Sequence, residues 1–230
     1  MSRQPGTRAG ASVAAKAPER GEWLPALGRL KGVEAYDRVL RVLSLDAIYE
    51  MLLRQLAFYP GDRVLDIGCG NGTLGSLMRR TRPEVAVTGL DRDPRMLLRA
   101  TGNPGSGDVS WIQGFAQRLP FGSGTFDSAT ASLFLHHLTR VQKMEALREA
   151  NRVLRVGGSL HVADWTKPKP GISALGFTLV RLLDGFERTA DHSSGRIVDL
   201  IQGAGFQPVE HLRMRHTWLG TLGFFRATKA

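Results

Sequence analysis

The chain has 230 residues, of which 42% are hydrophobic and 23% charged, as in an ordinary globular protein that can bury one sizeable core. Its single cysteine excludes an internal disulfide, and no apolar run approaches the ~18 residues of a transmembrane helix. The net charge of +10 suggests an anionic partner, but the basic residues form no track interleaved with aromatic side chains, so we do not expect nucleic-acid binding. The first residues lack the apolar core of a signal peptide, and we expect a cytoplasmic protein for which peripheral membrane contact stays open.

Three segments flank or interrupt the predicted main domain. Residues 1–22 are small, polar and basic, which predicts a flexible tail. Residues 23–60 predict an N-terminal helical cap, because apolar side chains recur at three- and four-residue steps from residue 33 until Pro60 and Gly61. Residues 61–230 predict the main domain, in which residues 166–191 are an insertion on the substrate side.

The main domain begins with an apolar run that ends in glycine at every second position. Residues 63–67 predict a strand, Gly68, Gly70 and Gly72 a tight turn, and residues 73–80 a helix. Glycine lets the backbone adopt positive φ and lets a ligand approach without meeting a Cβ atom. This corner is typical of nucleotide and cofactor sites, and Asp66 places a carboxylate two residues before its first glycine.

Strands and helices then alternate along the chain. We predict strands at 85–91, 109–113, 125–131 and 159–164, and helices at 93–100 and 140–154. Asp93 and Pro94 suit the N-cap and first position of their helix, and Val156-Gly157-Gly158 predicts a turn before the strand at 159. This alternation predicts an α/β fold with a doubly wound, Rossmann-like parallel sheet and helices on both faces.

The pattern changes after Asp164. A proline-rich link, W-T-K-P-K-P-G, leads into a predicted helix at 172–186 whose wide apolar face comprises Ile172, Leu175, Leu179, Val180, Leu183 and Phe186. A helix at 192–203 and strands near 206–212 and 222–228 complete the chain. The apolar helix indicates either an apolar or aromatic substrate at the strand ends or simple packing onto the domain.

Two classes of ligand fit the glycine corner. Gly70, Gly72 and Gly75 match the dinucleotide pattern G-x-G-x-x-G, and Asp91 lies 19 residues after Gly72, so an NAD(P)-dependent oxidoreductase is one alternative. Asp66 argues against it, because a carboxylate about 4 Å from a pyrophosphate charge is repelled by roughly 1 kcal/mol in water and about 4 kcal/mol at an effective dielectric constant of 20. A cationic ligand such as S-adenosylmethionine is attracted by the same carboxylate.

Five motifs follow one another along residues 60–165. They are Val64-Leu65-Asp66-Ile67-Gly68-Cys69-Gly70-Asn71-Gly72, Asp91, Ala116-Gln117-x-Leu119-Pro120-Phe121, Phe126-Asp127 with Leu135-His136-His137-Leu138, and Glu149-x-x-Arg152-Val153-Leu154-Arg155-x-Gly157-Gly158. Each is weak alone, but in this order and spacing the sequence resembles the class I S-adenosylmethionine-dependent methyltransferases. More narrowly, it resembles the branch that contains the quinone-biosynthesis C-methyltransferases and many small-molecule methyltransferases.

The resemblance implies S-adenosylmethionine as cofactor and a mostly parallel, seven-stranded sheet with an antiparallel last strand. It implies that Asp66 and Gly68 lie near the methionine end of the cofactor, that Asp91 binds both ribose hydroxyls, and that Ala116 and Gln117 flank the adenine. The other cofactor-binding candidates lie beside these positions or could close over them, and are Cys69, Gly70, Arg92, Ser132 and Tyr36. Cys69 is interpreted as a packing residue rather than a nucleophile.

One position departs from the family pattern. Phe115 stands where the family usually carries an acid that contacts the adenine amino group. A phenylalanine can cover a purine but cannot accept its hydrogen bond. Gln117 could compensate through its amide oxygen.

The catalytic candidates are His136, His137 and Asp164, at the ends of the fourth and fifth predicted strands. A histidine there could act as general base, because imidazole titrates near neutral pH. The alternative is that these residues only shape the cavity. No metal site is predicted.

The implied reaction is direct displacement. A carbon, oxygen or nitrogen of a small, apolar or aromatic acceptor attacks the sulfonium methyl group in line, and S-adenosylhomocysteine leaves, so the protein mainly supplies proximity and orientation. Besides the oxidoreductase, two alternatives stay open: a non-catalytic cofactor-binding or protein-interaction module, and methylation of RNA or a lipid headgroup. The absence of an N/D-P-P-Y/F tetrapeptide after the fourth strand weakens amino-group methylation. The sequence makes no prediction of oligomeric state.

Overall fold

The computed structural model describes residues 45–230. The predicted tail at 1–22, most of the predicted cap at 23–60, and the candidate Tyr36 therefore lie outside the described residues. Helix α2 (Leu45–Leu53) is the described part of the cap, and it begins beside the break predicted around Asp46. No helix in this part of the chain is long and apolar enough to cross a membrane.

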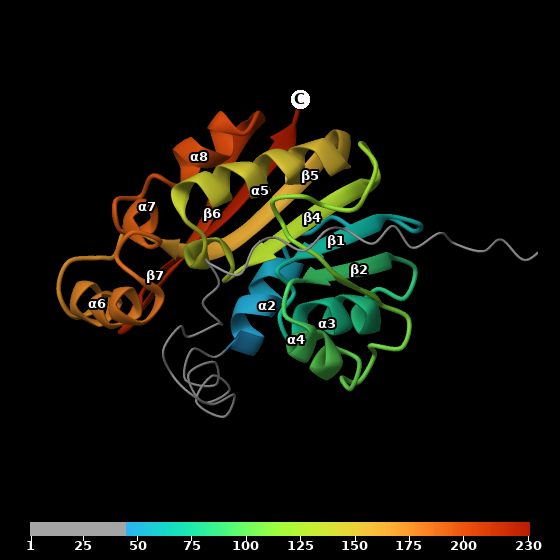
Figure 1. Ribbon diagram of the computed structural model, residues 1–230, viewed down its shortest axis with the longest axis horizontal. Coiled ribbons are helices and arrows are strands. Elements are labelled where there is room, and N and C mark those ends of the chain that lie inside the picture. The colour runs from blue at the N-terminus through green and yellow to red at the C-terminus, as the bar shows by residue number, and fades with distance from the viewer. Residues whose placement is uncertain (1–44) are drawn as a thin grey trace, which may run out of the picture.

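Seven strands form one sheet in the order β3-β2-β1-β4-β5-β7-β6. Their bounds are β1 (Arg63–Ile67), β2 (Ala86–Asp91), β3 (Ser110–Gln113), β4 (Phe126–Ser132), β5 (Leu154–Thr166), β6 (Phe206–Thr217) and β7 (Gly220–Lys229). The pairs among β1 to β5 are parallel, and β7 is antiparallel to both of its neighbours. The predicted mostly parallel, seven-stranded Rossmann-like sheet with an antiparallel last strand is confirmed (Figure 1).

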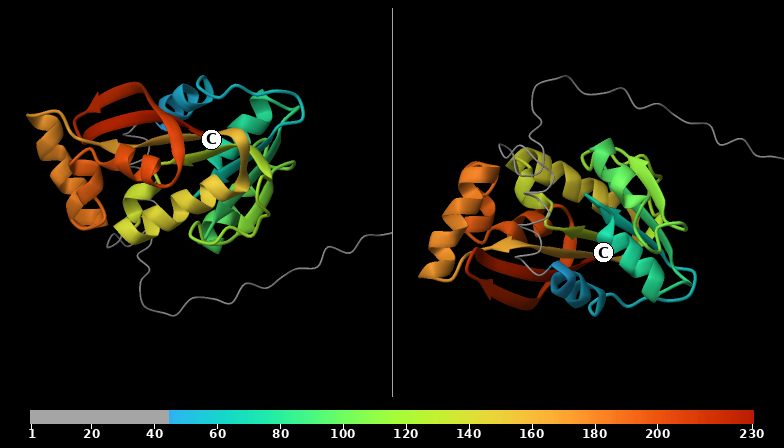
Figure 2. Two further views of the ribbon diagram at one scale, coloured as in Figure 1. Left: turned by 90° about the horizontal axis from the view of Figure 1, so that it is seen from above. Right: turned by 90° about the horizontal axis from the view of Figure 1, so that it is seen from below.

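Helices cover both faces of the sheet, as Figure 2 shows. Helices α2, α3 (Thr73–Thr81) and α6 (Ile172–Asp184) pack one hydrophobic core, to which β1 contributes Val64. Helices α5 (Arg140–Val153) and α8 (Ile197–Gly203) pack the other, to which β1 contributes Leu65. Successive residues of a strand point to opposite faces, so the continuous apolar run of β1 serves both cores.

Two local expectations were wrong. The turn predicted at 156–158 is a bulge within the long strand β5, because Phe126 and Ser128 of β4 pair with Leu154 and Ser159, leaving the extra residues to bulge at Gly157 (φ 75°). The helix predicted at 192–203 is two helices, α7 (Ala190–Ser193) and α8, which are separated at a second left-handed glycine (φ 78° at residue 195).

Helix α6 turns a different face inward than its apolar pattern predicts. It buries Ser173, Phe177, Val180 and Asp184. Much of the predicted face is exposed, together with a neighbouring leucine: Ile172, Leu175, Leu179, Leu182 and Phe186. The close approach of α6 to the β6–β7 turn sets this orientation, because a Cβ atom on Gly176 would lie 1.8 Å from the carbonyl oxygen of Trp218.

The remaining elements position the site. Helix α4 (Pro94–Ala100) follows β2, and its N-cap Asp93 accepts a hydrogen bond from the Arg95 backbone N–H (3.0 Å), as predicted. The short 3-10 helix η1 (Leu135–His137) follows β4. Helices α6 and α7 lie beyond the carboxyl end of β5 (Figure 1). Ligands of open α/β sheets bind outside the carboxyl ends of the strands, so these segments surround the expected site.

Candidate functional site

The glycine corner follows the carboxyl end of β1 and contains three glycines in the left-handed backbone conformation. Gly68, Gly70 and Gly72 have φ values of 70°, 53° and 74°. A Cβ atom at Gly68 would lie 2.2 Å from the Phe134 ring, and one at Gly72 would lie 2.5 Å from the Ala100 side chain. Conformation and space therefore both require glycine, and the result is a backbone turn with few Cβ atoms at the N-terminal end of α3.

Asp66 is fully buried in the middle of the sheet, opposite Gly89 of β2 and Thr130 of β4. Its Oδ1 accepts a hydrogen bond from Thr130 Oγ1 (2.8 Å), whereas Oδ2 has no hydrogen-bond partner. Burial raises the pKa of Asp66 to about 7, against the opposing effect of the Thr130 hydrogen bond, and the charge of Asp91 adds to the increase. This carboxylate retains an acceptor oxygen for a cationic ligand.

Asp91 ends β2 across the corner from Asp66. Its Oδ2 accepts a hydrogen bond from the Gly70 N–H (2.8 Å) and its Oδ1 accepts one from the Asp93 N–H (2.8 Å). Burial raises the pKa of Asp91 in spite of these bonds. Each carboxylate oxygen can accept a second hydrogen bond, so Asp91 is oriented by the backbone and still has acceptor capacity for a ligand's hydroxyl groups.

A shallow hollow that opens to solvent lies beside Asp91. Its lining comes from the ends of β1, β2, β3 and β4, and comprises Gly68, Leu90, Asp91, Arg92, Gly114, Phe115, Ala116, Gln117, Phe134 and Leu138. The Arg92 guanidinium carbon lies 5.1 Å from the centre of the Phe115 ring, a cation–π contact that holds the ring at this wall. Phe115 thus supplies an aromatic surface at the position where the family pattern usually has an acid.

The loop after β3 is held by a charged pair on α5. Glu149 Oε2 accepts a hydrogen bond from the Leu119 N–H (2.8 Å), and Arg152 donates to the carbonyl oxygens of Phe121 (2.8 Å) and Leu119 (3.0 Å). Glu149 and Arg152 also bond to each other (2.7 Å). The Glu-x-x-Arg motif therefore acts at a distance, by fixing the loop that places Ala116 in the hollow.

A cluster of histidines and carboxylates occupies the carboxyl ends of β4 and β5. Asp164 is completely buried and accepts hydrogen bonds from the backbone N–H groups of Leu135 (2.8 Å) and Trp165 (2.7 Å), and its Oδ1 lies 2.7 Å from His136 Nδ1. Burial alone would raise the pKa of Asp164, but the charge of His136 and these hydrogen bonds outweigh it and hold that pKa below the usual range. Asp164 is thus a well-satisfied carboxylate.

His136 is buried between two carboxylates. Burial alone would lower its pKa, but the charges of Asp164 and Asp184 outweigh burial and raise the pKa. Its Nε2 lies 3.7 Å from Asp184 Oδ2, and His137 Nδ1 lies 3.4 Å from Asp184 Oδ1. The His136 side chain is 6% exposed and that of His137 is 29% exposed, so His137 is the more accessible of the two.

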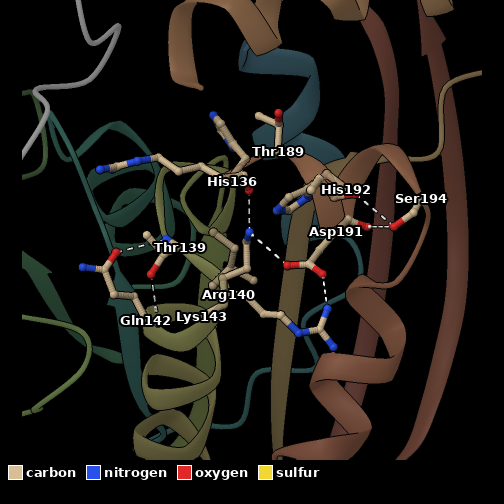
Figure 3. A network of polar contacts seen from close by, with 12 residues as sticks. His136, Thr139, Arg140, Gln142, Lys143, Thr189, Asp191, His192 and Ser194 are labelled. Atoms are coloured by element: carbon tan, nitrogen blue, oxygen red, sulfur yellow. Dashed lines mark hydrogen bonds and ion pairs between the residues drawn. The ribbon is translucent and has the colours of Figure 1, made fainter. Parts of the chain in front are cut away.

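A second polar network lies behind this cluster, in the close view of Figure 3. Lys143 of α5 is fully buried; its Nζ donates to the carbonyl oxygen of Arg188 and lies 3.5 Å from Asp191 of α7. Arg140 also pairs with Asp191, and burial lowers the pKa of Lys143. The network joins α7 to α5. It also holds η1 in place, because Arg188 donates to the His137 carbonyl oxygen (2.7 Å).

The structure brings most of the predicted site residues to one edge of the sheet. The hollow is lined by five of the predicted cofactor residues: Gly68, Asp91, Arg92, Ala116 and Gln117. Asp66 and Gly70 adjoin it through β1 and through the bond from Gly70 to Asp91. Cys69 is buried with a raised pKa, because burial disfavours the thiolate, and Ser132 is half-buried at the end of β4.

Sequence reasoning missed Asp184, His192 and Thr130. Asp184 continues the buried positions of α6 in steps of three and four from Phe177 and Val180, so a polar residue on a buried helical face was a signal available in the sequence. His192 is fully buried, with Nδ1 2.6 Å from the Trp165 carbonyl oxygen and a pKa lowered by burial to about 4. Thr130 carries no such signal, because its partner depends on the order of the strands.

Comparison with known proteins identifies the domain. Residues 64–158 match the family model described as a methyltransferase domain. The chain is similar to an uncharacterized methyltransferase, sll0829, of Synechocystis sp. (34% identity; 56% of this chain and 59% of that protein). It is also similar to the ubiquinone/menaquinone biosynthesis C-methyltransferase UbiE of Desulfotalea psychrophila (28% identity; 84% of this chain and 85% of that protein).

A solved structure agrees at the level of the fold. The SAM-dependent methyltransferase of Thermotoga maritima described as a possible histamine N-methyltransferase superposes with a TM-score of 0.67 at 22% identity, over 86% of this chain and 96% of that one.

The chain spans 50–59% of the length of the first curated relatives that it matches.

Proposed function

Because residues 64–158 match a methyltransferase domain and the chain is similar to proteins named UbiE, we propose that it is a class I S-adenosylmethionine-dependent methyltransferase of the quinone-biosynthesis C-methyltransferase branch. It would methylate a small apolar or aromatic acceptor by direct displacement. The observation that carries the proposal is the buried carboxylate of Asp66, whose Oδ2 has no hydrogen-bond partner. A pyrophosphate would be repelled there, whereas the α-ammonium of S-adenosylmethionine would supply the missing donor.

The other contacts assigned to the cofactor follow the lining of the hollow. Asp91 would accept hydrogen bonds from the ribose hydroxyls with the acceptor capacity that its two backbone bonds leave over. Ala116 and Gln117 would flank the adenine, and the Phe115 ring would cover one side of it. The left-handed backbone at Gly68 and Gly70 would let the methionine end approach closely.

When bound, S-adenosylmethionine supplies a methyl group on a positively charged sulfur, and an electron pair of the acceptor forms the new bond as S-adenosylhomocysteine leaves. The chain's own part is to hold the two reactants in line and to exclude water. His136, His137 and Asp164 are assigned to the acceptor end of the site, because Phe134 and Leu138 on either side of the histidines line the hollow. Their part is secondary, since a charged leaving group reduces the need for a general base.

An apolar acceptor is supported by helix α6. This helix lies beyond the carboxyl end of β5 and exposes large apolar side chains, among them Leu175 (75% exposed) and Leu182 (59% exposed). The relatives named UbiE suggest a quinone-like ring methylated on carbon, at low identity. We therefore place electron-rich aromatic rings, such as hydroquinones and phenols, first among the acceptors to be tried.

The test has a binding part and a turnover part. Calorimetric titration of the full chain with S-adenosylmethionine, S-adenosylhomocysteine and NAD⁺ is expected to detect the first two and not the third. Production of S-adenosylhomocysteine is then followed with hydroquinones, phenols and primary amines as acceptors. Binding without turnover on any acceptor would favour the non-catalytic module, and binding of NAD⁺ in place of S-adenosylmethionine would contradict the proposal.

A further inference from the structure

We propose that His136, His137 and Asp184 form a binding site for one divalent transition-metal ion, of which Zn²⁺ fits the donors best. The two histidines come from η1 and the carboxylate is the last residue of α6. Each residue offers one ligand atom, and the three atoms lie within 4.8 Å of one another. Imidazole nitrogens with a carboxylate favour zinc and its neighbours over Mg²⁺ or Ca²⁺, which prefer oxygen ligands alone.

The distances between the donor atoms suit coordination better than hydrogen bonding. His137 Nδ1 lies 3.4 Å from Asp184 Oδ1, and His136 Nε2 lies 3.7 Å from Asp184 Oδ2. Good N–H···O hydrogen bonds have separations of about 2.7–3.2 Å. Two ligand atoms bound tetrahedrally to Zn²⁺ at roughly 2.0–2.1 Å are about 3.3–3.4 Å apart. The three donor atoms, which lie within 4.8 Å of one another, would therefore draw together around an ion.

Asp184 is the carboxylate in this region that lacks adequate partners. Asp164 accepts bonds from backbone N–H groups and from His136, and Asp191 is paired with Arg140 and Lys143. Asp184 is only 7% exposed, and its Oδ1 has no hydrogen bond within the usual range, its contact being with His137 Nδ1 at 3.4 Å. Burying a charged oxygen with long contacts is costly, and a metal ion is one ligand that reduces the cost.

Asp164 prepares His136 for coordination. An ionised carboxylate can only accept hydrogen bonds, so the 2.7 Å contact with Asp164 Oδ1 places the proton of the neutral ring on His136 Nδ1. The lone pair of the ring is then on Nε2, the atom that faces Asp184. In zinc sites a ligand histidine commonly donates its other ring N–H to a carboxylate, which fixes the tautomer and the ring orientation.

Every histidine and cysteine that could bind the ion lies in the described part of the chain. All six histidines and the single cysteine of the chain lie beyond residue 44. Three protein ligands leave one tetrahedral position for water or another oxygen ligand, as in zinc sites that keep an open position. The exposed side of His137 gives an ion access to the site.

The site is tested with the metal alone, on the full chain freed of any histidine tag and stripped of metal with a chelator. Calorimetric titration with Zn²⁺ is expected to give one ion per chain. Co²⁺ is expected to compete and to give the visible absorption of a four-coordinate site, and Mg²⁺ is expected not to bind. Because no S-adenosylmethionine is present, a failure here leaves the proposed methyl transfer standing, and the reverse also holds.

Two variants and two matched controls locate the ion. Asp184→Asn and His137→Gln are each expected to weaken Zn²⁺ binding by at least about 100-fold, above the 10–100-fold typical of losing a second-shell partner. His211→Gln and Asp199→Asn, which remove the same groups from exposed positions, are expected to change it less than twofold. Circular dichroism checks that each variant folds. His137 is partly exposed, so His137→Gln is the site variant with the smallest expected effect on folding.

Three results would overturn the proposal. The wild type could fail to bind Zn²⁺ at micromolar concentration, which would leave the cluster as an ion pair of imidazolium and carboxylate. Binding could survive both site variants, or it could be lost in His211→Gln, which would assign it to the surface. Any of these would exclude His136, His137 and Asp184 as a metal site.

Discussion

Asp66 and Asp164 are both carboxylates at the carboxyl ends of parallel strands, and both are completely buried, yet their environments have opposite effects. Asp164 has backbone N–H donors and a histidine, and its pKa is held below the usual range. Asp66 has one hydroxyl donor and an unpartnered oxygen, and burial raises its pKa to about 7. Burial by itself does not decide the charge of a carboxylate; the number of donors around it does.

Under the proposed function, the difference separates a structural carboxylate from a ligand-binding one. Asp164 is satisfied within the protein and fixes η1 against β5. We expect Asp66 to receive its second donor from the cofactor.

The largest expected effect is on stability. Asp164→Asn replaces an acceptor-only group by one with N–H groups that face other donors, and is expected to lower the free energy of unfolding by about 3–5 kcal/mol, as when a buried charged network loses a partner. Asp66→Asn keeps the acceptor for Thr130 and removes a buried charge, so it is not expected to lower the free energy of unfolding. Urea denaturation of the ligand-free protein measures both, and equal losses would contradict the distinction.

Affinity for the cofactor is expected to depend on the two carboxylates of the glycine corner, Asp91 and Asp66. Asp91→Ala is expected to weaken S-adenosylmethionine binding by about 10–100-fold, because a charged acceptor contributes roughly 1.5–3 kcal/mol. Asp66→Asn is expected to weaken it by about tenfold, and Asp199→Asn, in an exposed position of α8, should leave it unchanged. Calorimetric titration of the three variants checks the ranking; unaltered affinity in Asp91→Ala would remove this residue from the site.

The pH dependence of S-adenosylmethionine binding should follow the ionisation of Asp66. A cationic ligand prefers the ionised carboxylate, and the pKa of about 7 means that the affinity of the wild type falls below neutral pH, by up to about the tenfold loss expected of Asp66→Asn. Asp66→Asn is expected to lack this dependence. A titration series between pH 5.5 and 8.5, made at about constant ionic strength, separates the two.

The same pKa fixes the sign of a stability effect in the ligand-free protein. The folded state binds the Asp66 proton more tightly than the unfolded chain does, so this contribution to stability is fully present below about pH 4 and is lost as the pH rises through about 7. Relative to Asp66→Asn, the wild type should therefore lose stability between these limits. A gain over this range would contradict the environment described for Asp66.

The smallest effect is expected from Thr130. Thr130→Val removes the one hydrogen bond that lowers the pKa of Asp66, at a cost of about 1 kcal/mol in stability. The pH midpoint for S-adenosylmethionine binding should move upward by up to about one unit. Ser128→Ala, two residues earlier on the same strand, is the matched control and should leave the midpoint in place.

The two regions also differ in how far the sequence predicts them. The glycine corner is local: strand, three glycines and helix follow one another, so β1, α3 and the role of Gly68 can be read from adjacent residues. Asp93 and Pro94 predict the start of α4 in the same way. The alternation of strands with helices predicts a parallel sheet, and the family resemblance adds the seven strands and the antiparallel last strand, but neither signals the bulge in β5.

The histidine cluster is assembled from elements far apart in the sequence. His136 and Asp164 were named as candidates because each ends a strand, but their direct bond depends on the pairing of β4 with β5. Asp184 reaches them only because α6 buries the face that carries Phe177. The apolar pattern of α6 indicated another face, since packing against the β6–β7 turn outweighs the burial of its leucines.

A crystal structure of the full chain with S-adenosylhomocysteine tests the central claim most directly. The account predicts that the amino group of the ligand lies within hydrogen-bond reach of Asp66, directly or through one water, that both ribose hydroxyls contact Asp91, and that the adenine lies against Ala116 and Phe115. A ligand bound elsewhere, or one whose amino group lies away from Asp66, would contradict it.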